Sequence, residues 1–367
     1  MTSTNSPIAR LIEYGQSPWY DNLTRQLITG GGLARMIDED GIRGVTSNPT
    51  IFEKAMAAGE GYDEQLIEVT RAGAPIDSAY WALVLDDIRH AADVLRPTYD
   101  ALDGADGFVS VEVAPDRADE TAATIDQVHW LHGQAARPNV FVKIPATMAG
   151  VPAIEQCLAE GIPINITLTF SLVRYAQVIE AYFRGLERHA DQGGDISRVA
   201  SVASFFVSRV DTEADRRLPE SHPLRGKVAV ANAKLAYQLF LEKFTGDRWA
   251  ALEARGARKQ RPLWASTSTK NPAYSDTLYV DELVGRDTVN TLAQPSINAL
   301  HDHGNPQPDT ILRDVDGARR VIDELPAAGI DYDDLTDTLE REGVGSFTRS
   351  YRDCLASLEK RAAEITR

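Results

Sequence analysis

The stretch NVFVKIPAT, residues 139–147, is an apolar and largely β-branched run that carries a single ammonium group, on Lys143. Such a run predicts a strand that is buried on both faces, as in a parallel sheet. Burying an unpaired ammonium is costly, so a lysine placed there tends to lose its proton and to become a nucleophile toward carbonyl carbon. From this segment alone, a strand-end lysine that extends its amine to water is an equally good interpretation.

Similar short runs recur along the chain and alternate with helical patterns. The eight predicted strands cover residues 18–22, 44–47, 107–113, 140–146, 163–170, 199–206, 261–267 and 287–293. Apolar residues at helical spacing occupy intervals between them, at residues 149–158, 172–189 and 228–244. This alternation predicts the α/β class, with residues 1–367 forming a single (β/α)8 TIM barrel domain.

An open doubly wound sheet is the alternative architecture. It would require a glycine-rich phosphate turn directly after an early strand. The only glycine cluster near the N-terminus, residues 30–32, lies between two helical patterns and follows no predicted strand. We therefore interpret that cluster as a helix end and favour the barrel.

Extra helices are expected around residues 50–100 and 209–260, where the gaps between strands are long. A C-terminal helical extension is expected at residues 332–367. Gly343 and Gly345 predict an interruption in this extension, after which Ser346 would cap the final helix. On that final helix Phe347 and Tyr351 would share one face, in a position to help close a pocket.

The chain has a net charge of −16, and 43% of its residues are hydrophobic. A field of that sign repels nucleic acid and anionic membranes, so neither is expected as a partner. It also repels phosphorylated substrates at long range, so any phosphate site has to be made locally from a few cations and backbone N–H groups.

No metal site is expected, because the seven histidines are scattered and the two cysteines have no motif spacing. The cysteines are expected to be reduced thiols of a cytoplasmic protein. Residues 1–8 are polar and lack the apolar core of a signal peptide, and no apolar run approaches the roughly 20 residues of a membrane helix. We expect a soluble, cytoplasmic protein, either a monomer or a homodimer.

Polar residues stand near the carboxyl ends of seven predicted strands, where barrel enzymes carry their active sites. Ser110 and Glu112 share one strand face, and Asn165 and Thr167 share another. Singly, each polar residue has a simpler explanation: Asp21 could be a helix cap, and Asn48 before Pro49 could belong to a turn. Together they indicate a site, because an unpaired buried polar group costs about 1–3 kcal/mol. The candidates are Asp21, Thr46, Asn48, Ser110, Glu112, Lys143, Asn165, Thr167, Ser204, Arg209, Ser266 and Lys270.

This set suits carbonyl chemistry through a lysine imine. Lys143 would attack a ketone, Glu112 would relay protons, and Thr167 would hold the relaying water. Asp21 would deprotonate a substrate hydroxyl so that a carbon–carbon bond breaks, with the imine as electron sink.

The remaining polar residues would hold the substrate. Asn48 and Asn165, with Thr46 and Ser110 near them, would bind sugar hydroxyls. Arg209, Ser204 and Lys270 would supply the local phosphate site, with Ser266 near them.

The chain resembles the transaldolase family across nearly its whole length. The segments that carry the resemblance are GVTSNPTIF at 44–52, SVEV at 110–113, VKIPAT at 142–147, GIPINITL at 161–168 and ASFFVSR at 203–209. The segment WASTSTKNP at 264–272 is similar to the form found in bacterial enzymes of the longer-chain branch. No single motif is specific, but their order and spacing together are.

The resemblance implies a transferase of the pentose phosphate pathway that needs no metal or cofactor. Such an enzyme moves a dihydroxyacetone unit from sedoheptulose 7-phosphate to glyceraldehyde 3-phosphate, which gives erythrose 4-phosphate and fructose 6-phosphate. The implied roles are the Schiff-base lysine for Lys143, the acid/base for Asp21, the water-activating pair for Glu112 and Thr167, the hydroxyl ligands for Asn48 and Asn165, and the phosphate ligands for Ser204 and Arg209.

One departure from the family pattern leaves an assignment open. Shorter members have an arginine after strand seven as a second phosphate ligand, whereas this chain has Lys270 in a loop of different length. The alternative is that Lys270 is a surface lysine, and the assignment of Ser266 depends on the same question.

Rival functions remain for the same set of residues. A class I fructose-6-phosphate-type aldolase would use the same imine and release the carbanion to a proton. A non-catalytic sugar-phosphate-binding barrel would not need Lys143, Glu112 and Asp21 together. A pyridoxal phosphate enzyme also forms a lysine imine, but no other feature of the sequence favours that cofactor.

Overall fold

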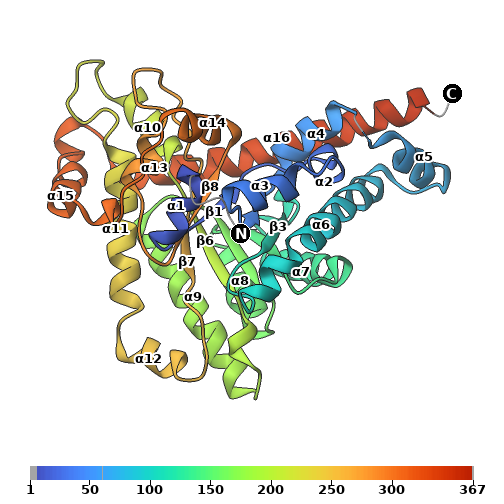
Figure 1. Ribbon diagram of the computed structural model, residues 1–367, viewed down its shortest axis with the longest axis horizontal. Helices are drawn as coiled ribbons and strands as arrows, with labels where there is room; N and C mark the ends of the chain where they lie inside the picture. Colours follow the sequence, from blue (N-terminus) through green and yellow to red (C-terminus); the bar gives the residue numbers. More distant parts are fainter. Residues whose placement is uncertain (1–5, 60, 366–367) are drawn as a thin grey trace.

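The computed structural model describes residues 6–59 and 61–365, and its centre is a closed barrel of eight parallel strands in sequence order (Figure 1). The strands are β1 (Gln16–Tyr20), β2 (Gly44–Val45), β3 (Phe108–Glu112), β4 (Val140–Pro145), β5 (Ile164–Thr169), β6 (Ser201–Phe206), β7 (Arg261–Ala265) and β8 (Thr288–Leu292). Each begins and ends within two residues of its predicted bounds. The prediction of a (β/α)8 barrel is confirmed.

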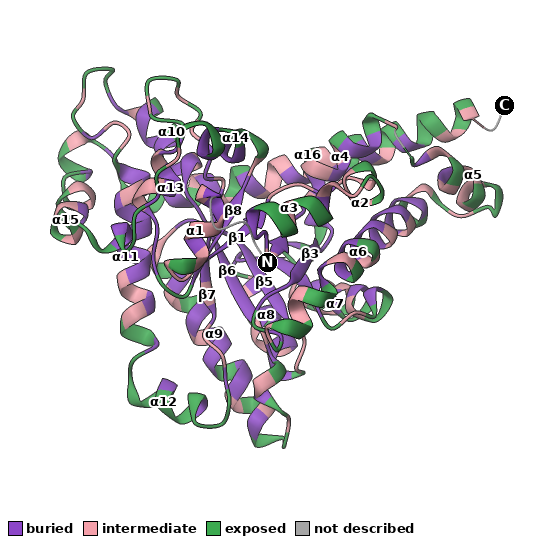
Figure 2. Ribbon diagram, in the orientation of Figure 1, coloured by how far each residue is buried: buried purple, intermediate pink, exposed green. Residues whose placement is uncertain are grey.

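The strands are buried almost throughout, as expected for parallel strands covered on both faces (Figure 2). Aromatic rings pack together inside the barrel, away from its polar strand ends. The rings of Phe108 and Phe141 stack with centroids 4.1 Å apart, and Trp19 lies 6.2 Å from Phe141. This apolar floor leaves the polar strand ends as the part of the interior that can do chemistry.

Helices surround the barrel (Figure 1). They are α1 (Pro7–Glu13), α2 (Arg25–Thr29), α3 (Gly32–Asp40), α4 (Pro49–Ala57), α5 (Asp63–Arg71), α6 (Ile76–Ala101), α7 (Thr121–Ala135), α8 (Gly150–Ala159), α9 (Leu172–Asp191), α10 (Ser208–Arg217), α11 (Val228–Lys243), α12 (Asp247–Glu253), α13 (Leu278–Glu282), α14 (Gln294–His303), α15 (Val315–Asp323) and α16 (Tyr332–Ile365), with short 3-10 turns at Pro115–Arg117, Ile196–Arg198, Thr310–Leu312 and Pro326–Ala328.

The helical intervals were predicted correctly. Residues 149–158, 172–189 and 228–244 correspond to α8, α9 and α11. The glycine cluster at residues 30–32 lies at the junction of α2 and α3, as expected of a helix end. The extra helices are α4 to α6 in the first long gap and α10 to α12 in the second.

The predicted interruption of the C-terminal extension is wrong. Helix α16 continues through Gly343 and Gly345 without a break, so Ser346 caps nothing. A glycine in a helix costs about 1 kcal/mol relative to alanine, which tertiary packing readily offsets. Gly343 is buried, and a Cβ built on it would lie 2.9 Å from a methyl carbon of Leu168. The glycine is there because the helix passes very close to β5.

Helix α16 crosses the carboxyl end of the barrel. It packs along α4, against α10 and against β5, and in Figure 1 it runs in red across the top of the view. The C-terminal segment therefore reaches residues from both halves of the barrel. The helices that follow β2 and β6, α4 and α10, lie beside it, and both begin at polar strand ends.

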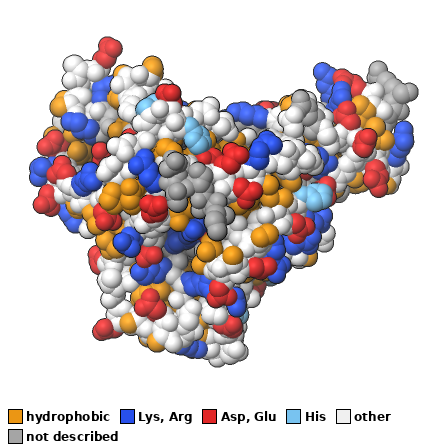
Figure 3. All heavy atoms as spheres, in the orientation of Figure 1, with side chains coloured by type: hydrophobic (Ala, Val, Ile, Leu, Met, Phe, Trp, Pro, Cys, Tyr) orange, Lys and Arg blue, Asp and Glu red, His pale blue; other side chains and the backbone are white. Residues whose placement is uncertain are grey.

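The visible surface carries acidic and basic side chains interspersed, without a single-sign face (Figure 3). Within residues 6–59 and 61–365, every helix is too short or too polar to cross a membrane.

Candidate active site

Lys143 points into the barrel instead of reaching to water. Its residue is 4% exposed, and its strand position is in register with Glu112 on β3 and Asn165 on β5. The Nζ atom lies 3.3 Å from Oε2 of Glu112 and donates a hydrogen bond of 3.2 Å to the carbonyl oxygen of Ser47. The interpretation of Lys143 as a strand-end lysine that extends to solvent is wrong.

Glu112 is placed to exchange a proton with the Lys143 amine. Burial raises the pKa of its carboxyl, and the nearby Lys143 ammonium opposes that rise. The 3.3 Å contact is an ion pair without the angles of a hydrogen bond, so both carboxylate oxygens lack a hydrogen-bond partner in the protein. The buried hydroxyl of Thr167 also lacks one. Unpaired buried polar groups are unfavourable, so these three atoms are available to a substrate or a relaying water.

Asp21 follows β1 and is held by a chain of two threonines. The hydroxyl of Thr46 donates to Oδ1 of Asp21 at 2.7 Å, and the Thr46 and Thr291 hydroxyl oxygens are 2.6 Å apart. Burial raises the pKa of Asp21, and the Lys143 ammonium and the Thr46 hydrogen bond counteract the rise. Thr24, not Asp21, caps α2, so the helix-cap explanation for Asp21 is wrong.

A row of hydroxyl and amide groups joins β3, β5 and β6 inside the barrel. Asn165 Nδ2 donates to the Ser110 hydroxyl at 2.9 Å, and the Ser204 hydroxyl donates to Asn165 Oδ1 at 2.8 Å. Because Ser204 gives its hydrogen to Asn165, it can donate to a phosphate only after its hydroxyl rotates. The row fixes the orientation of the Asn165 amide.

Asn48 combines a structural task with a free donor group. Its Oδ1 accepts the backbone N–H of Ile51 at 3.0 Å, and Pro49 follows it at the first position of α4. The structural task is a helix cap and not the turn that the sequence offered as an alternative. The cap leaves the side-chain N–H₂ group available to a substrate hydroxyl.

Two cations, one on α10 and one in the loop after β7, lie at the mouth of the barrel. Arg209 stands at the second position of α10, and no residue within 6–59 and 61–365 hydrogen-bonds or ion-pairs with its guanidinium. Lys270 is exposed at its outer end, yet its pKa is lowered, first by partial burial and then by the Arg209 charge, with Asp21 opposing. Lys270 is thus close to both charges. Ser266 is less free, because its hydroxyl lies 2.8 Å from that of Ser208.

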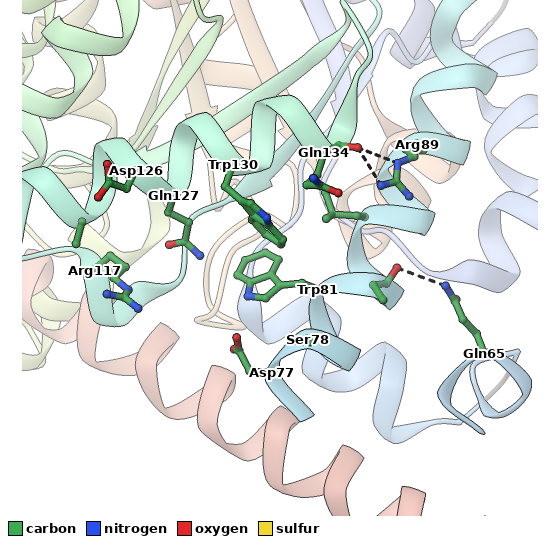
Figure 4. A pocket seen from close by; sticks show the side chains of 13 residues that line it. Gln65, Asp77, Ser78, Trp81, Arg89, Arg117, Asp126, Gln127, Trp130 and Gln134 are labelled. Atoms are coloured by element: carbon green, nitrogen blue, oxygen red, sulfur yellow. Dashed lines mark hydrogen bonds between the residues drawn. The ribbon is translucent and has the colours of Figure 1, made fainter. Parts of the chain in front are cut away.

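Candidate residues line more than one hollow near the barrel rim, and a small one is bordered by Asn48 and Glu112. A hollow of about 390 Å³ is lined by Asp21 together with Asn22, Lys54 and Gln294. A larger one, of about 660 Å³ between α6 and α7, has the rings of Trp81 and Trp130 as its wall and none of the candidate residues (Figure 4). The substrate site therefore belongs to the barrel mouth. Within the described residues, no group of three or more His, Cys, Asp or Glu side chains could hold a metal ion.

Comparison with known proteins identifies this arrangement. The model of the family described as transaldolase/fructose-6-phosphate aldolase matches residues 18–358. The chain belongs to the transaldolase/fructose-6-phosphate aldolase family. Membership in this family makes it an enzyme that transfers aldehyde or ketone residues through a lysine Schiff base.

The transaldolase relatives cover nearly the full chain. The transaldolase of Acidothermus cellulolyticus is 51% identical over 358 residues, which is 96% of each chain. Transaldolase 2 of Streptomyces coelicolor is 47% identical over 98% of this chain and 97% of its own. The transaldolase of Mycolicibacterium paratuberculosis is 47% identical over the whole of both chains.

The structure also brings in residues that the sequence interpretation missed. Thr291 on β8 supports Thr46, and Phe206 on β6 lies against Arg209. Phe206 could have been found by strand alternation, because it shares a face with Ser204. The carbonyl oxygen of Ser47 receives the Lys143 ammonium, and a backbone acceptor of this kind leaves no signal in the sequence.

Proposed function

We propose that Lys143 is the nucleophile of a transaldolase reaction that moves a dihydroxyacetone unit from sedoheptulose 7-phosphate to glyceraldehyde 3-phosphate. The supporting observation is the 3.3 Å contact between Lys143 Nζ and the buried Glu112 carboxylate, beneath Asp21 at the mouth of the same barrel. An amine with a proton acceptor beside it and a second carboxylate near it has what imine chemistry requires.

In the first half of the reaction the neutral amine attacks the ketone carbon of the donor. Glu112 takes the proton from nitrogen and returns one to the carbinolamine oxygen, which leaves as water. Asp21 then removes the proton of the hydroxyl on the carbon beyond the scissile bond, the carbon–carbon bond breaks, and the electron pair passes into the imine. Erythrose 4-phosphate leaves, and the three-carbon enamine remains bound to Lys143.

In the second half the enamine attacks the aldehyde of glyceraldehyde 3-phosphate. Asp21 returns its proton to the new hydroxyl, and water hydrolyses the imine to release fructose 6-phosphate. Asn165 and Asn48 hold the hydroxyls of the bound unit, and Arg209, with Lys270 and Ser204, binds the phosphate.

Borohydride reduction in the presence of fructose 6-phosphate tests this proposal. Reduction should add mass to the peptide that contains Lys143, and Lys143→Met should lose both labelling and transfer. Lys234 is a matched control, since it is also buried and its Nζ lies 2.7 Å from Glu282. Labelling at Lys234, or persistent labelling of Lys143→Met, would refute the assignment.

A transfer assay with and without the aldehyde acceptor distinguishes a transferase from a simple aldolase. The proposal predicts that fructose 6-phosphate is consumed at an appreciable rate only when erythrose 4-phosphate is present. Rapid release of free dihydroxyacetone without an acceptor would instead support the aldolase.

The same proposal treats residues 1–367 as one functional domain in the cytoplasm. Its site draws on residues from β1 through α16, and both cysteines, Cys157 and Cys354, are free and buried, which suits a reducing compartment. Cell fractionation tests the location, and size-exclusion chromatography with light scattering decides between a monomer and a homodimer.

A further inference from the structure

The guanidinium of Arg209 lies over two aromatic rings that come from distant parts of the chain. Its Cζ atom is 5.2 Å from the ring centroid of Phe206 on β6 and 5.7 Å from that of Phe347 on α16. Both rings are buried. The active-site cation is therefore held jointly by the barrel and by the C-terminal helix.

Ring contacts of this kind orient a guanidinium without using its hydrogen-bond donors. A cation over an aromatic ring is attracted by about 0.5–1 kcal/mol at exposed sites and by more when desolvated. Arg209 makes no ion pair or hydrogen bond within the described residues, so its five N–H donors remain free. A planar fork of free donors fits a phosphate group. The strength of phosphate binding depends on the orientation of the guanidinium plane.

Contacts on either side of Phe347 fix the position of its ring. One turn earlier, Gly343 brings α16 to the side chain of Leu168, and a Cβ built there would lie 3.6 Å from Arg209 Nη1. One turn later, Ser350 shares a 2.8 Å hydrogen bond with Thr50 on α4, and Tyr351 donates to Asp77 on α6. These contacts with β5, α4 and α6 hold the α16 backbone in place on both sides of Phe347.

We propose that Phe347 is a positioning residue that sets the orientation of Arg209 toward the substrate phosphate, which makes α16 part of the phosphate site. This inference rests on the proposed role of Arg209 as a phosphate ligand. It predicts that removing the Phe347 ring weakens recognition of phosphate and leaves the imine chemistry at Lys143 intact.

The test is Phe347→Leu, which keeps an apolar side chain and removes the ring. The KM for fructose 6-phosphate should rise about 2- to 10-fold, in line with the loss of one cation–ring contact, while kcat changes little. Inhibition by inorganic phosphate should weaken by a similar factor. Borohydride trapping with dihydroxyacetone, which carries no phosphate, should be unchanged.

Two further variants serve as controls. Phe347→Tyr keeps the ring and should restore a KM close to that of the wild type. Leu358→Val lies further along α16, at another buried position, and should leave all three measurements unchanged. If Phe347→Leu does not fold, as judged by its thermal unfolding, Phe347→Met conserves the volume better and takes its place.

The possible outcomes separate this inference from the function on which it rests. If trapping with dihydroxyacetone falls as much as the affinity for fructose 6-phosphate, Phe347 merely covers the site and the inference is overturned. It is also overturned if Phe347→Leu changes nothing while Arg209→Ala raises KM. If Arg209→Ala itself leaves KM unchanged, the phosphate role of Arg209 fails first.

Discussion

The hydroxyl of Thr46 donates a 2.7 Å hydrogen bond to the carboxylate of Asp21. Since that hydrogen is committed to Asp21, the 2.6 Å contact between Thr46 and Thr291 is a hydrogen bond that Thr291 donates. Asp21 just after β1, Thr46 just after β2 and Thr291 on β8 thus form one chain that ends on the proposed base. The chain stabilises the ionised carboxylate against the burial that raises its pKa.

We predict that Thr46→Val moves the acid limb of the pH profile of kcat/KM to higher pH. Losing the hydrogen bond raises the pKa of Asp21 further, and Asp21 acts as a base only when ionised. Activity should therefore be lost at a higher pH as the solution is acidified. Thr291→Val should shift the limb in the same direction by less. An acid limb that stays in place in Thr46→Val would mean that Asp21 does not set it.

Asp21→Ala should separate imine formation from bond cleavage. Lys143 and Glu112 remain, so borohydride with fructose 6-phosphate should still label the Lys143 peptide. Transfer should fall by about 10²-fold or more, the usual loss when a general base is removed. Mass spectrometry and the transfer assay measure the two effects separately. Loss of trapping would instead place Asp21 in substrate binding or in the structure of the site.

Arg209→Ala and Lys270→Ala should both raise KM, and the increase should be larger for Arg209→Ala. Each removes a cation from the mouth of the barrel, so KM for both phosphorylated substrates should rise with a smaller change in kcat. The increase should be larger for Arg209, which offers a fork of donors, than for the more exposed Lys270. An unchanged KM in Lys270→Ala would make Lys270 a surface lysine, the alternative that the sequence left open.

Gly343→Ala and Gly345→Ala form a matched pair on α16. A Cβ on Gly343 meets Leu168 at 2.9 Å, whereas a Cβ on Gly345 meets only the end of Arg349, at 3.6 Å. Gly345→Ala should stabilise the helix by up to about 1 kcal/mol and keep wild-type activity. Gly343→Ala should lower kcat/KM, because it pushes the helix away from β5 or displaces the residue next to Thr167. Steady-state kinetics and thermal unfolding of both variants test this prediction. Equal changes in kcat/KM and in unfolding temperature for the two variants would contradict it.

Asp211 on α10 makes stability depend on pH. Its buried carboxylate accepts hydrogen bonds from the backbone N–H of Ala229 at 2.8 Å and the Tyr279 hydroxyl at 2.9 Å. Burial still raises its pKa from 3.8 to about 6. A raised carboxyl pKa favours folding below the ordinary value, and that contribution is lost as pH rises through 6, a change of about 3 kcal/mol at 1.4 kcal/mol per pH unit.

Asp211→Asn removes this titration. Measured by denaturant unfolding, its stability relative to the wild type should improve by a few kcal/mol between pH 4 and pH 7, whatever constant offset the altered hydrogen bonds introduce. A pH-independent difference between the two proteins would show that Asp211 does not ionise in this range.

The strands and their polar ends could be predicted from the sequence because they depend on residues that are adjacent in the chain. A buried parallel strand needs a continuous apolar run. Polar residues that interrupt such runs, as Lys143, Glu112 and Asn165 do, are therefore candidates for function. Thr291 gave no comparable signal, because a threonine in a strand is ordinary β-branched filler. Its role depends on Thr46 and Asp21, which lie more than 240 residues away in the chain.

The C-terminal helix was misjudged for a related reason. Local propensity treats Gly343 as a helix breaker, whereas the fold uses its missing side chain to bring α16 against Leu168 and Arg209. A glycine in a helix costs about 1 kcal/mol relative to alanine, and close packing along a 34-residue helix outweighs that cost.

By itself the sequence determined the eight-stranded barrel and placed twelve candidate polar residues near its strand ends, because the periodicity and the apolar character of a strand are properties of neighbouring residues. Only the tertiary structure decided that Lys143 faces Glu112 rather than water, that Thr291 supports Asp21 through Thr46, and that Phe347 lies against Arg209. Those relationships are distances between segments far apart in the chain, and closing the barrel and docking α16 across it set them.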